Sequence, residues 1–158
     1  MRVHTLALAQ HLASPPDEVF PFFADASNLA RITPPWLGFR VLTPEPIELR
    51  AGTRIDYRLE LHRVRLGWRT EIVLWDPPRR FVDVQRSGPY ALWHHTHGFE
   101  PDGAGTRVRD VVRYALPLGP LGAAAHAAFV RRDLARIFAF RHREVARILE
   151  RPSRQLAW

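Results

Sequence analysis

The chain has 158 residues, of which 46% are hydrophobic, and this composition supports a single domain with a full core. It contains no cysteine, which excludes disulfides, thiolate catalysis and zinc–thiolate sites. The formal charge is +7, and all 23 basic residues are arginines spread along the chain. We interpret them as a basic surface and expect no nucleic-acid partner.

Two further features bear on location. No run approaches the roughly 20 apolar residues of a membrane span. Residues 1–12 alternate apolar and polar side chains and lack the continuous apolar core of a signal peptide. We therefore expect a cytoplasmic protein.

The N-terminal part of the chain predicts one strand followed by two short helices. Residues 2–12 alternate as a strand does. Ser14 is expected to cap a helix whose first position is Pro15. A second short helix is expected to start within residues 25–28 and to end at residues 33–35, because the two prolines there remove donors and restrict the chain.

The middle of the chain predicts antiparallel strands separated by turns rich in proline, glycine and charged residues. The expected strands are residues 36–42, 54–61, 66–75, 80–86, 90–100 and 106–116. In each strand, alternate residues are assigned to the interior. Hairpins closed symmetrically about their turns pair these interior residues: Leu61 with Leu66, Leu74 with Phe81, Gln85 with Trp93, and Phe99 with Thr106.

The C-terminal part predicts one uninterrupted helix from Leu121 to about Arg151, about 45 Å long. Its apolar stripe consists of Val130, Leu134, Ile137, Phe138, Val145, Ile148 and Leu149. Residues 152–158 are expected to be a tail, which leaves residues 1–151 as a single domain.

This order of elements resembles the helix-grip fold of the START-like (SRPBCC) superfamily. The matching motifs are Ser14-Pro15-Pro16-Asp17-Glu18-Val19-Phe20, Ile32-Thr33-Pro34-Pro35-Trp36-Leu37, Gly88-Pro89-Tyr90 followed by Trp93-x-His95-x-His97-x-Phe99, and Tyr114-x-Leu116-Pro117. The resemblance implies an α+β fold. In it, a curved antiparallel sheet of about seven strands wraps a long C-terminal helix, two short helices lie between strands one and two, and a cavity lies between sheet and helix.

Within the superfamily, the motifs are similar to a small bacterial ligand-binding subgroup related to polyketide cyclases and CoxG, a domain also found fused to epimerase-like enzymes. The resemblance implies binding, and with it transport or presentation, of a hydrophobic or amphipathic small molecule such as a lipid, polyketide or isoprenoid. Two alternatives stay open. One is a cyclase, dehydratase or isomerase in which His95 and Asp110 move protons. The other is a partner protein of an epimerase-like enzyme.

One group of ionisable residues is expected on the interior face of the sheet. Asp83 and Asp110 flank His95 in the predicted register, and cross-strand neighbours lie about 5 Å apart between β-carbons. Two carboxylates beside one imidazole favour its cationic form. Three roles stay open for this group: a ligand anchor, a general acid and base, or an internal network that holds the sheet.

The same strand raises the question of a metal site. His95 and His97 share a face, and Asp83 or Asp110 could join them as ligands. No third nitrogen or sulfur ligand has an obvious place in the sequence, so we expect no metal ion. No glycine-rich phosphate loop is present either, and we expect no cofactor.

Aromatic residues on the predicted interior faces exceed what a plain core beneath one helix requires, and they suit a cavity wall. Arg141 lies on or beside the apolar stripe of the helix. It either extends to solvent or reaches Asp83, Asp110 or a ligand carboxylate. The residues expected to bind ligand are Tyr57, Trp68, Phe81, Asp83, Gln85, Trp93, His95, His97, Phe99, Asp110, Tyr114, Phe138 and Arg141. Weak contact with an anionic membrane surface suits the basic charge, and the oligomeric state stays open.

Overall fold

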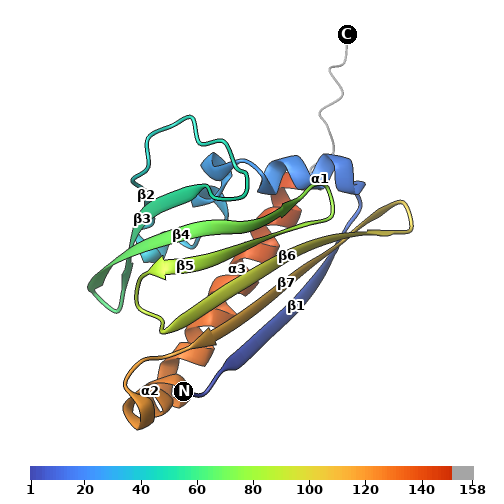
Figure 1. The fold of residues 1–158 in the computed structure, drawn as a ribbon. Coiled ribbons are helices and arrows are strands. Elements are labelled where there is room, and N and C mark those ends of the chain that lie inside the picture. Colours follow the sequence, from blue (N-terminus) through green and yellow to red (C-terminus); the bar gives the residue numbers. More distant parts are fainter. Residues whose placement is uncertain (151–158) are drawn as a thin grey trace.

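The computed structural model of the protein describes residues 1–150 (Figure 1). A seven-stranded antiparallel sheet in the order β1-β7-β6-β5-β4-β3-β2 curves around one long helix, α3. The strands are β1 (His4–Leu12), β2 (Arg40–Val41), β3 (Arg54–Leu61), β4 (Val64–Asp76), β5 (Arg80–Ser87), β6 (Leu92–Asp102) and β7 (Gly105–Ala115). The α+β helix-grip architecture expected from the sequence is confirmed.

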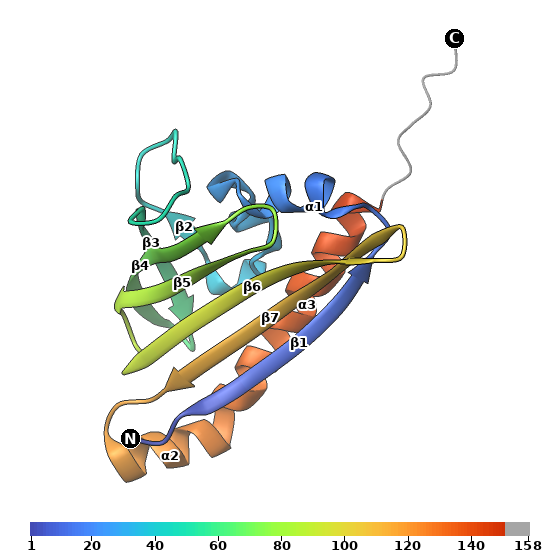
Figure 2. The same ribbon diagram turned by 45° about the vertical axis from the view of Figure 1, so that its right-hand side comes forward.

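The helices lie at the two ends and across the concave face of the sheet (Figure 2). They are α1 (Pro16–Phe23), the short 3-10 helices η1 (Ala26–Asn28), η2 (Ala30–Ile32) and η3 (Pro35–Leu37), then α2 (Gly119–Ala125), the π-helical turn η4 (His126–Val130) and α3 (Arg131–Leu149). Within residues 1–150, no helix is long and apolar enough to cross a membrane.

The start of α1 differs from the prediction. Pro15 has an extended conformation and occupies the N-cap position, so Pro16 is the first helical residue. No side chain caps this end, and the predicted cap by Ser14 is wrong. The backbone carbonyl of Ser14 instead accepts a hydrogen bond from the Thr106 hydroxyl at 2.7 Å, which ties the helix entrance to β7.

The strand predicted over residues 36–42 is also mostly wrong. The Pro35–Leu37 segment forms η3, and Gly38 follows it in the left-handed region with φ of 50°. Glycine adopts this conformation without steric cost, so it turns the chain sharply here. Only Arg40–Val41 then pairs with β3, as a two-residue edge strand.

Two hairpins differ from the predicted register by two residues. Leu61 pairs with Val64, and not with Leu66, because only the two residues between β3 and β4 form the turn. Phe99 pairs with Val108, and not with Thr106. A shift of two preserves which face each side chain occupies, so the interior assignments hold although the pairs are wrong.

The β4–β5 hairpin departs further. A register shift between Ile72 and Leu74 places Trp75, and not Leu74, opposite Phe81. A shift of one residue exchanges the faces, so the predicted interior position of Leu74 is wrong. The β5–β6 ladder has the predicted register. Its last pair toward the turn is Val84 with His94, and the next step in the same register would pair Gln85 with Trp93.

The C-terminal helix is longer at its start and less regular than predicted. It begins at Gly119, and one π-helical turn, His126–Val130, separates α2 from α3. The backbone N–H of Arg131 bonds the carbonyl of His126, the wide spacing that defines this turn. The predicted tail, residues 152–158, lies outside the described residues, as does Arg151.

Two apolar clusters form the core, one toward each end of α3. The first joins α1 to the sheet and contains Leu12, Val19, Phe20, Phe23, Ile32, Ile72, Phe81, Phe99, Val108 and Val145. The second joins the start of the long helix to the sheet and contains Trp68, Trp93, Val112, Tyr114, Val130, Leu134 and Phe138. Burying one such side chain stabilises the fold by roughly 1.5–3 kcal/mol. Polar residues lie between the two clusters.

Candidate functional site

A cavity of about 280 Å³ lies between the concave face of the sheet and α3. Most of its wall is apolar, because a single helix cannot cover the whole of a strongly curved sheet. Apolar side chains of this wall include Phe22, Phe23, Leu29, Ile32, Leu37, Ile55, Leu59, Leu66, Ile72, Leu134 and Ile137. Volumes near this size are at the lower end of those of small-molecule sites.

Nine of the predicted ligand-binding residues line this cavity: Tyr57, Trp68, Phe81, Asp83, Trp93, His95, His97, Phe138 and Arg141. Four predicted residues are not part of the wall: Gln85, Phe99, Asp110 and Tyr114. Each of these four has other partners that explain its position.

Gln85 closes the β5–β6 turn. Its amide nitrogen donates to the Tyr90 carbonyl at 2.7 Å, and its amide oxygen accepts from the Tyr90 N–H at 3.2 Å. Phe99 is 1% exposed and packs against Phe20 and Phe23 within the first core cluster. Tyr114 pairs its hydroxyl with Nε2 of His126 at 2.9 Å, next to the π-helical turn.

Asp83, His95 and His97 of the wall belong to a network of two carboxylates and three imidazoles, whose other two members, Asp110 and His142, lie behind the wall. His95 Nε2 lies 2.8 Å from Asp110 Oδ1, and His97 Nε2 lies 2.7 Å from Asp83 Oδ2. His142 of α3 adds a third contact, from its Nε2 to Asp110 Oδ2 at 3.2 Å. The two strand histidines therefore pair with carboxylates on opposite sides.

This arrangement corrects the predicted geometry in one respect. Asp83 does lie opposite His95 in the β5–β6 register, but its short hydrogen bond goes to His97. Asp110 lies opposite His97 and reaches diagonally to His95. The two-residue register difference in the β6–β7 hairpin is what places Asp110 opposite His97 and not opposite His95.

His142 was not among the predicted site residues. Its spacing offered a signal, because it follows Phe138 by four positions and precedes Val145 by three, and such residues share a helix face. The helix is held in place here by Gln10 of β1, whose amide donates to the His142 carbonyl at 2.6 Å. That bond fixes the position of α3 relative to β1, and with it the point at which the His142 imidazole contacts Asp110.

Burial and hydrogen bonding set the charges of the network. Burial alone would raise the pKa of the Asp110 carboxyl, but hydrogen bonds from His142 and His95 outweigh it and the pKa lies well below its usual range. The pKa of Asp83 is likewise lowered, since its contacts with His97 and His95 overcome burial. Burial, helped by the neighbouring His95, lowers the pKa of His97 to about 4.

Arg141 lines the cavity and forms no ion pair with Asp83 or Asp110 in the described structure. Its guanidinium carbon lies 5.6 Å from the ring centroid of Phe23, a cation–π distance. Its Nε is buried without a hydrogen-bond partner among the described residues. The wall has a second such donor, the indole N–H of Trp68.

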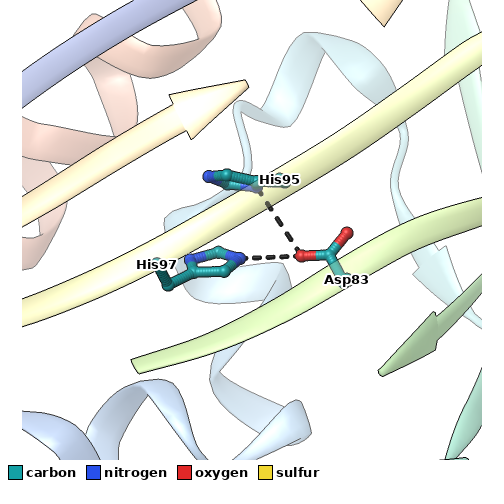
Figure 3. A group of neighbouring side chains, drawn as sticks. All are labelled: Asp83, His95 and His97. Carbon is teal, nitrogen blue, oxygen red and sulfur yellow. Dashed lines mark hydrogen bonds and ion pairs between the residues drawn. The ribbon is translucent and has the colours of Figure 1, made fainter. Parts of the chain in front are cut away.

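Three donor atoms of the wall also converge on one point. The ligand atoms of Asp83, His95 and His97 lie within 4.8 Å of one another (Figure 3). Nitrogen and carboxylate oxygen are the ligands that divalent transition metals take in proteins. This group can therefore hold a metal ion, and of the two carboxylates considered from the sequence it is Asp83 that joins the two histidines.

Comparison with known proteins places the chain among related folds. Residues 4–150 match the family described as polyketide cyclase / dehydrase and lipid transport. Among curated proteins, no sequence matches this chain.

Solved structures give the same fold. The Zhui aromatase/cyclase from Streptomyces sp. R1128 aligns with a TM-score of 0.76 at 17% identity, covering 98% of each chain. A protein of Thermus thermophilus aligns with a TM-score of 0.74 at 19% identity, covering 93% of this chain and 97% of its own. The ginseng major latex-like protein 151 aligns with a TM-score of 0.68 at 12% identity, covering 93% and 97%.

Proposed function

The chain belongs to the polyketide cyclase / dehydrase and lipid transport family, and from this premise we propose that it binds a small hydrophobic or amphipathic molecule in the cavity. The ligand classes that suit it are short lipids, polyketides and isoprenoids. The observation that carries the proposal is the cavity of about 280 Å³ between sheet and α3, whose wall is mostly apolar with a few polar groups. Pockets of this composition bind ligands by burying an apolar body and orienting a few polar groups.

The polar groups of the wall indicate the chemistry of the ligand's polar end. Trp68 Nε1 and Arg141 Nε are buried donors without partners among the described residues. An unsatisfied buried donor costs about 1–3 kcal/mol, and a ligand acceptor removes that cost. We therefore propose that the ligand carries an oxygen acceptor, such as a carbonyl, beside its apolar body.

We propose that the ligand enters beside the short helices. Asp25, Asn28 and Thr33 from this region belong to the cavity wall, and they are polar where most of the wall is apolar. The expected cytoplasmic location and weak contact with anionic membrane surfaces remain parts of the proposal. Weak contact of a cytoplasmic protein with the membrane surface would let it exchange an apolar ligand with the membrane.

Prodan, a fluorescent naphthyl ketone with an apolar body and one carbonyl, is a suitable probe. Its emission shifts to the blue on entering an apolar site, and we expect a Kd on the order of 1–10 μM. Leu134→Trp fills the cavity from the buried side of α3, and it should weaken binding at least tenfold. Ala135→Trp, at the next and exposed position of the same helix, is the matched control and should bind like the wild type.

Thermal unfolding of both tryptophan variants checks that they are folded. Equal prodan affinity in Leu134→Trp and the wild type would place the probe outside the cavity and contradict the proposal. A prodan spectrum that the folded wild type leaves unchanged would contradict it as well.

A second candidate function is cyclisation or dehydration of a poly-β-ketone substrate. The observation that favours it is His95, which lines the cavity and whose Nε2 lies 2.8 Å from the buried Asp110 carboxylate. A carboxylate that fixes one side of an imidazole prepares the other side for proton transfer. Turnover of a linear poly-β-ketone thioester that disappears in His95→Gln but persists in His94→Gln supports it, and absence of turnover by the wild type excludes this substrate class.

A further inference from the structure

We propose that Asp83, His95 and His97 form a binding site for one divalent first-row transition-metal ion, of which Zn²⁺ and Co²⁺ are suitable probes. The site is part of the cavity wall, and the three side chains come from the adjacent strands β5 and β6. This proposal concerns metal binding alone, so its test does not depend on whether the cavity binds an organic ligand.

The donor atoms already converge. Figure 3 shows the two imidazoles directed at the same carboxylate oxygen, Asp83 Oδ2. That oxygen lies 2.7 Å from His97 Nε2 and 3.7 Å from His95 Nδ1. Ligands at about 2.0–2.1 Å in tetrahedral geometry lie about 3.3 Å apart. The two oxygen–nitrogen distances differ from this value by roughly half an ångström, and the two ring nitrogens, which lie within 4.8 Å of each other, would approach by up to about 1.5 Å.

A single buried carboxylate, that of Asp110, lies behind both imidazoles and forms a hydrogen bond with one of them, His95. Asp110 Oδ1 lies 2.8 Å from His95 Nε2 and 3.5 Å from His97 Nδ1, the ring nitrogens that face away from Asp83. A metal-bound histidine commonly donates its second N–H to a carboxylate, which fixes the tautomer and aims the free lone pair at the metal. His97 Nδ1 has no hydrogen-bond partner among the described residues, and the carboxylate oxygen of Asp110 is 3.5 Å away.

The third ligand is also held in place. Thr70 lies with its hydroxyl 3.2 Å from Asp83 Oδ1, the carboxylate oxygen that does not face the imidazoles. Oδ2 is thereby left for the metal. The sequence-based expectation of no metal rested on the lack of a third nitrogen or sulfur ligand beside a carboxylate, and we take that carboxylate, Asp83, as the third protein ligand.

Charge and burial favour a cation at this point. His95 is 5% exposed and His97 is 4% exposed, and two carboxylates lie within 4 Å of their rings. Two imidazoles with one carboxylate suit Zn²⁺, Co²⁺, Ni²⁺ and Fe²⁺ better than Mg²⁺ or Ca²⁺, which prefer oxygen ligands. Three protein ligands leave at least one coordination position, and we infer that it faces the cavity because all three residues line it.

The test is a Co²⁺ titration of tag-free protein that has been stripped with EDTA. The wild type should develop visible d–d absorption that saturates at one Co²⁺ per chain, and Zn²⁺ should abolish it by competition. His97→Gln and Asp83→Asn should each weaken binding at least 100-fold. His94→Gln is the matched control, because this neighbouring histidine on β6 projects from the opposite face and should leave the titration unchanged.

Asp110→Asn provides an independent readout, since it leaves all three ligands in place and removes only the carboxylate that lies behind the rings and bonds His95. Loss of such an outer carboxylate typically costs 10–100-fold in metal affinity. Thermal unfolding identifies folded variants, and His95→Gln replaces His97→Gln if the latter does not fold. Absence of saturable absorption up to about 1 mM Co²⁺, or equal affinity in the wild type, Asp83→Asn and the histidine variants, would overturn the proposal.

Discussion

His97 illustrates how burial controls chemistry at the level of single residues. It stacks on the ring of Phe81 with centroids 4.1 Å apart, and its Nε2 contacts Asp83. Its burial lowers its pKa to about 4, whereas an unfolded chain has a histidine pKa near 6.5. Folding therefore keeps a neutral imidazole where the unfolded chain would take up a proton.

The first prediction is loss of stability in mild acid. Because the unfolded state binds more protons between about pH 6.5 and pH 4, the free energy of unfolding should fall as the pH drops through this window. The lowered pKa values of Asp83 and Asp110 add a further fall below their ordinary value of 3.8. Denaturant unfolding at a series of pH values measures both.

The control for this prediction compares two histidines. His97→Gln removes the titrating group and should flatten the dependence between about pH 6.5 and pH 4. His11→Gln changes an exposed histidine and should leave the dependence intact. An equal slope in the wild type and in His97→Gln would show that His97 does not titrate in this way.

The second prediction compares two carboxylates that pair with basic side chains, one buried and one exposed. Asp110 is 1% exposed and bonds two imidazoles, so Asp110→Ala should destabilise the fold by about 3–5 kcal/mol, the cost of breaking a buried pair. Asp56 pairs with Arg69 on the outer face with much of its side chain exposed, so Asp56→Ala should cost less than about 1 kcal/mol. Similar losses in the two variants, measured by urea unfolding, would contradict this account of the network.

At the level of elements, the close approach of β1 to the β6–β7 hairpin depends on Gly105. A Cβ at this position would overlap the carbonyl oxygen of Leu12 and touch the imidazole of His11. Gly105 starts β7 where it lies against the end of β1, so the two strands meet only without a side chain there.

The third prediction follows from this contact. Gly105→Ala should lower the free energy of unfolding by about 1–3 kcal/mol or more, because backbone atoms must move apart. Gly67→Ala on β4 is the control, because a Cβ there meets nothing within 4 Å. Thermal unfolding distinguishes them, and a Gly105→Ala variant as stable as Gly67→Ala would show that the strands adjust without cost.

The sequence pattern predicted the elements better than it predicted their registers. The interior assignments stayed correct despite the two-residue register differences at Leu61 and Phe99, because side chains on a strand return to the same face every two residues. The interior assignment of Leu74 was wrong, because the bulge before it shifts the register by one residue and no residue pattern indicated that bulge. The strand expected around Trp36 was wrong because the left-handed turn at Gly38 depends on backbone geometry.

The candidate site was predictable where it depended on one strand and not where it depended on packing between elements. The alternation of β6 placed His95 and His97 together on the interior side. The contact of His142 with Asp110 required the position of α3 across the sheet, which helical spacing alone does not fix. The sequence grouped His95 and His97 with Asp83 or Asp110 as possible metal ligands, but which carboxylate faces both ring nitrogens depends on the directions of the folded side chains.

At the level of the whole molecule, two apolar clusters anchor the ends of the long helix and leave space between them. The first cluster packs α1 and Val145 against the sheet, and the second packs Val130, Leu134 and Phe138. The cavity and the polar network lie in the intervening region. The same fold in structures with 12–19% identity shows that the architecture tolerates wide change in sequence.

Native mass spectrometry of the gently purified protein tests the central claim, that the cavity binds a small hydrophobic or amphipathic molecule. The wild type should carry one additional mass, or acquire one stoichiometrically on addition of prodan, and Leu134→Trp should lose it while Ala135→Trp keeps it. Equal adducts in the wild type and folded Leu134→Trp, or no adduct in any of them even with prodan added, would contradict the claim.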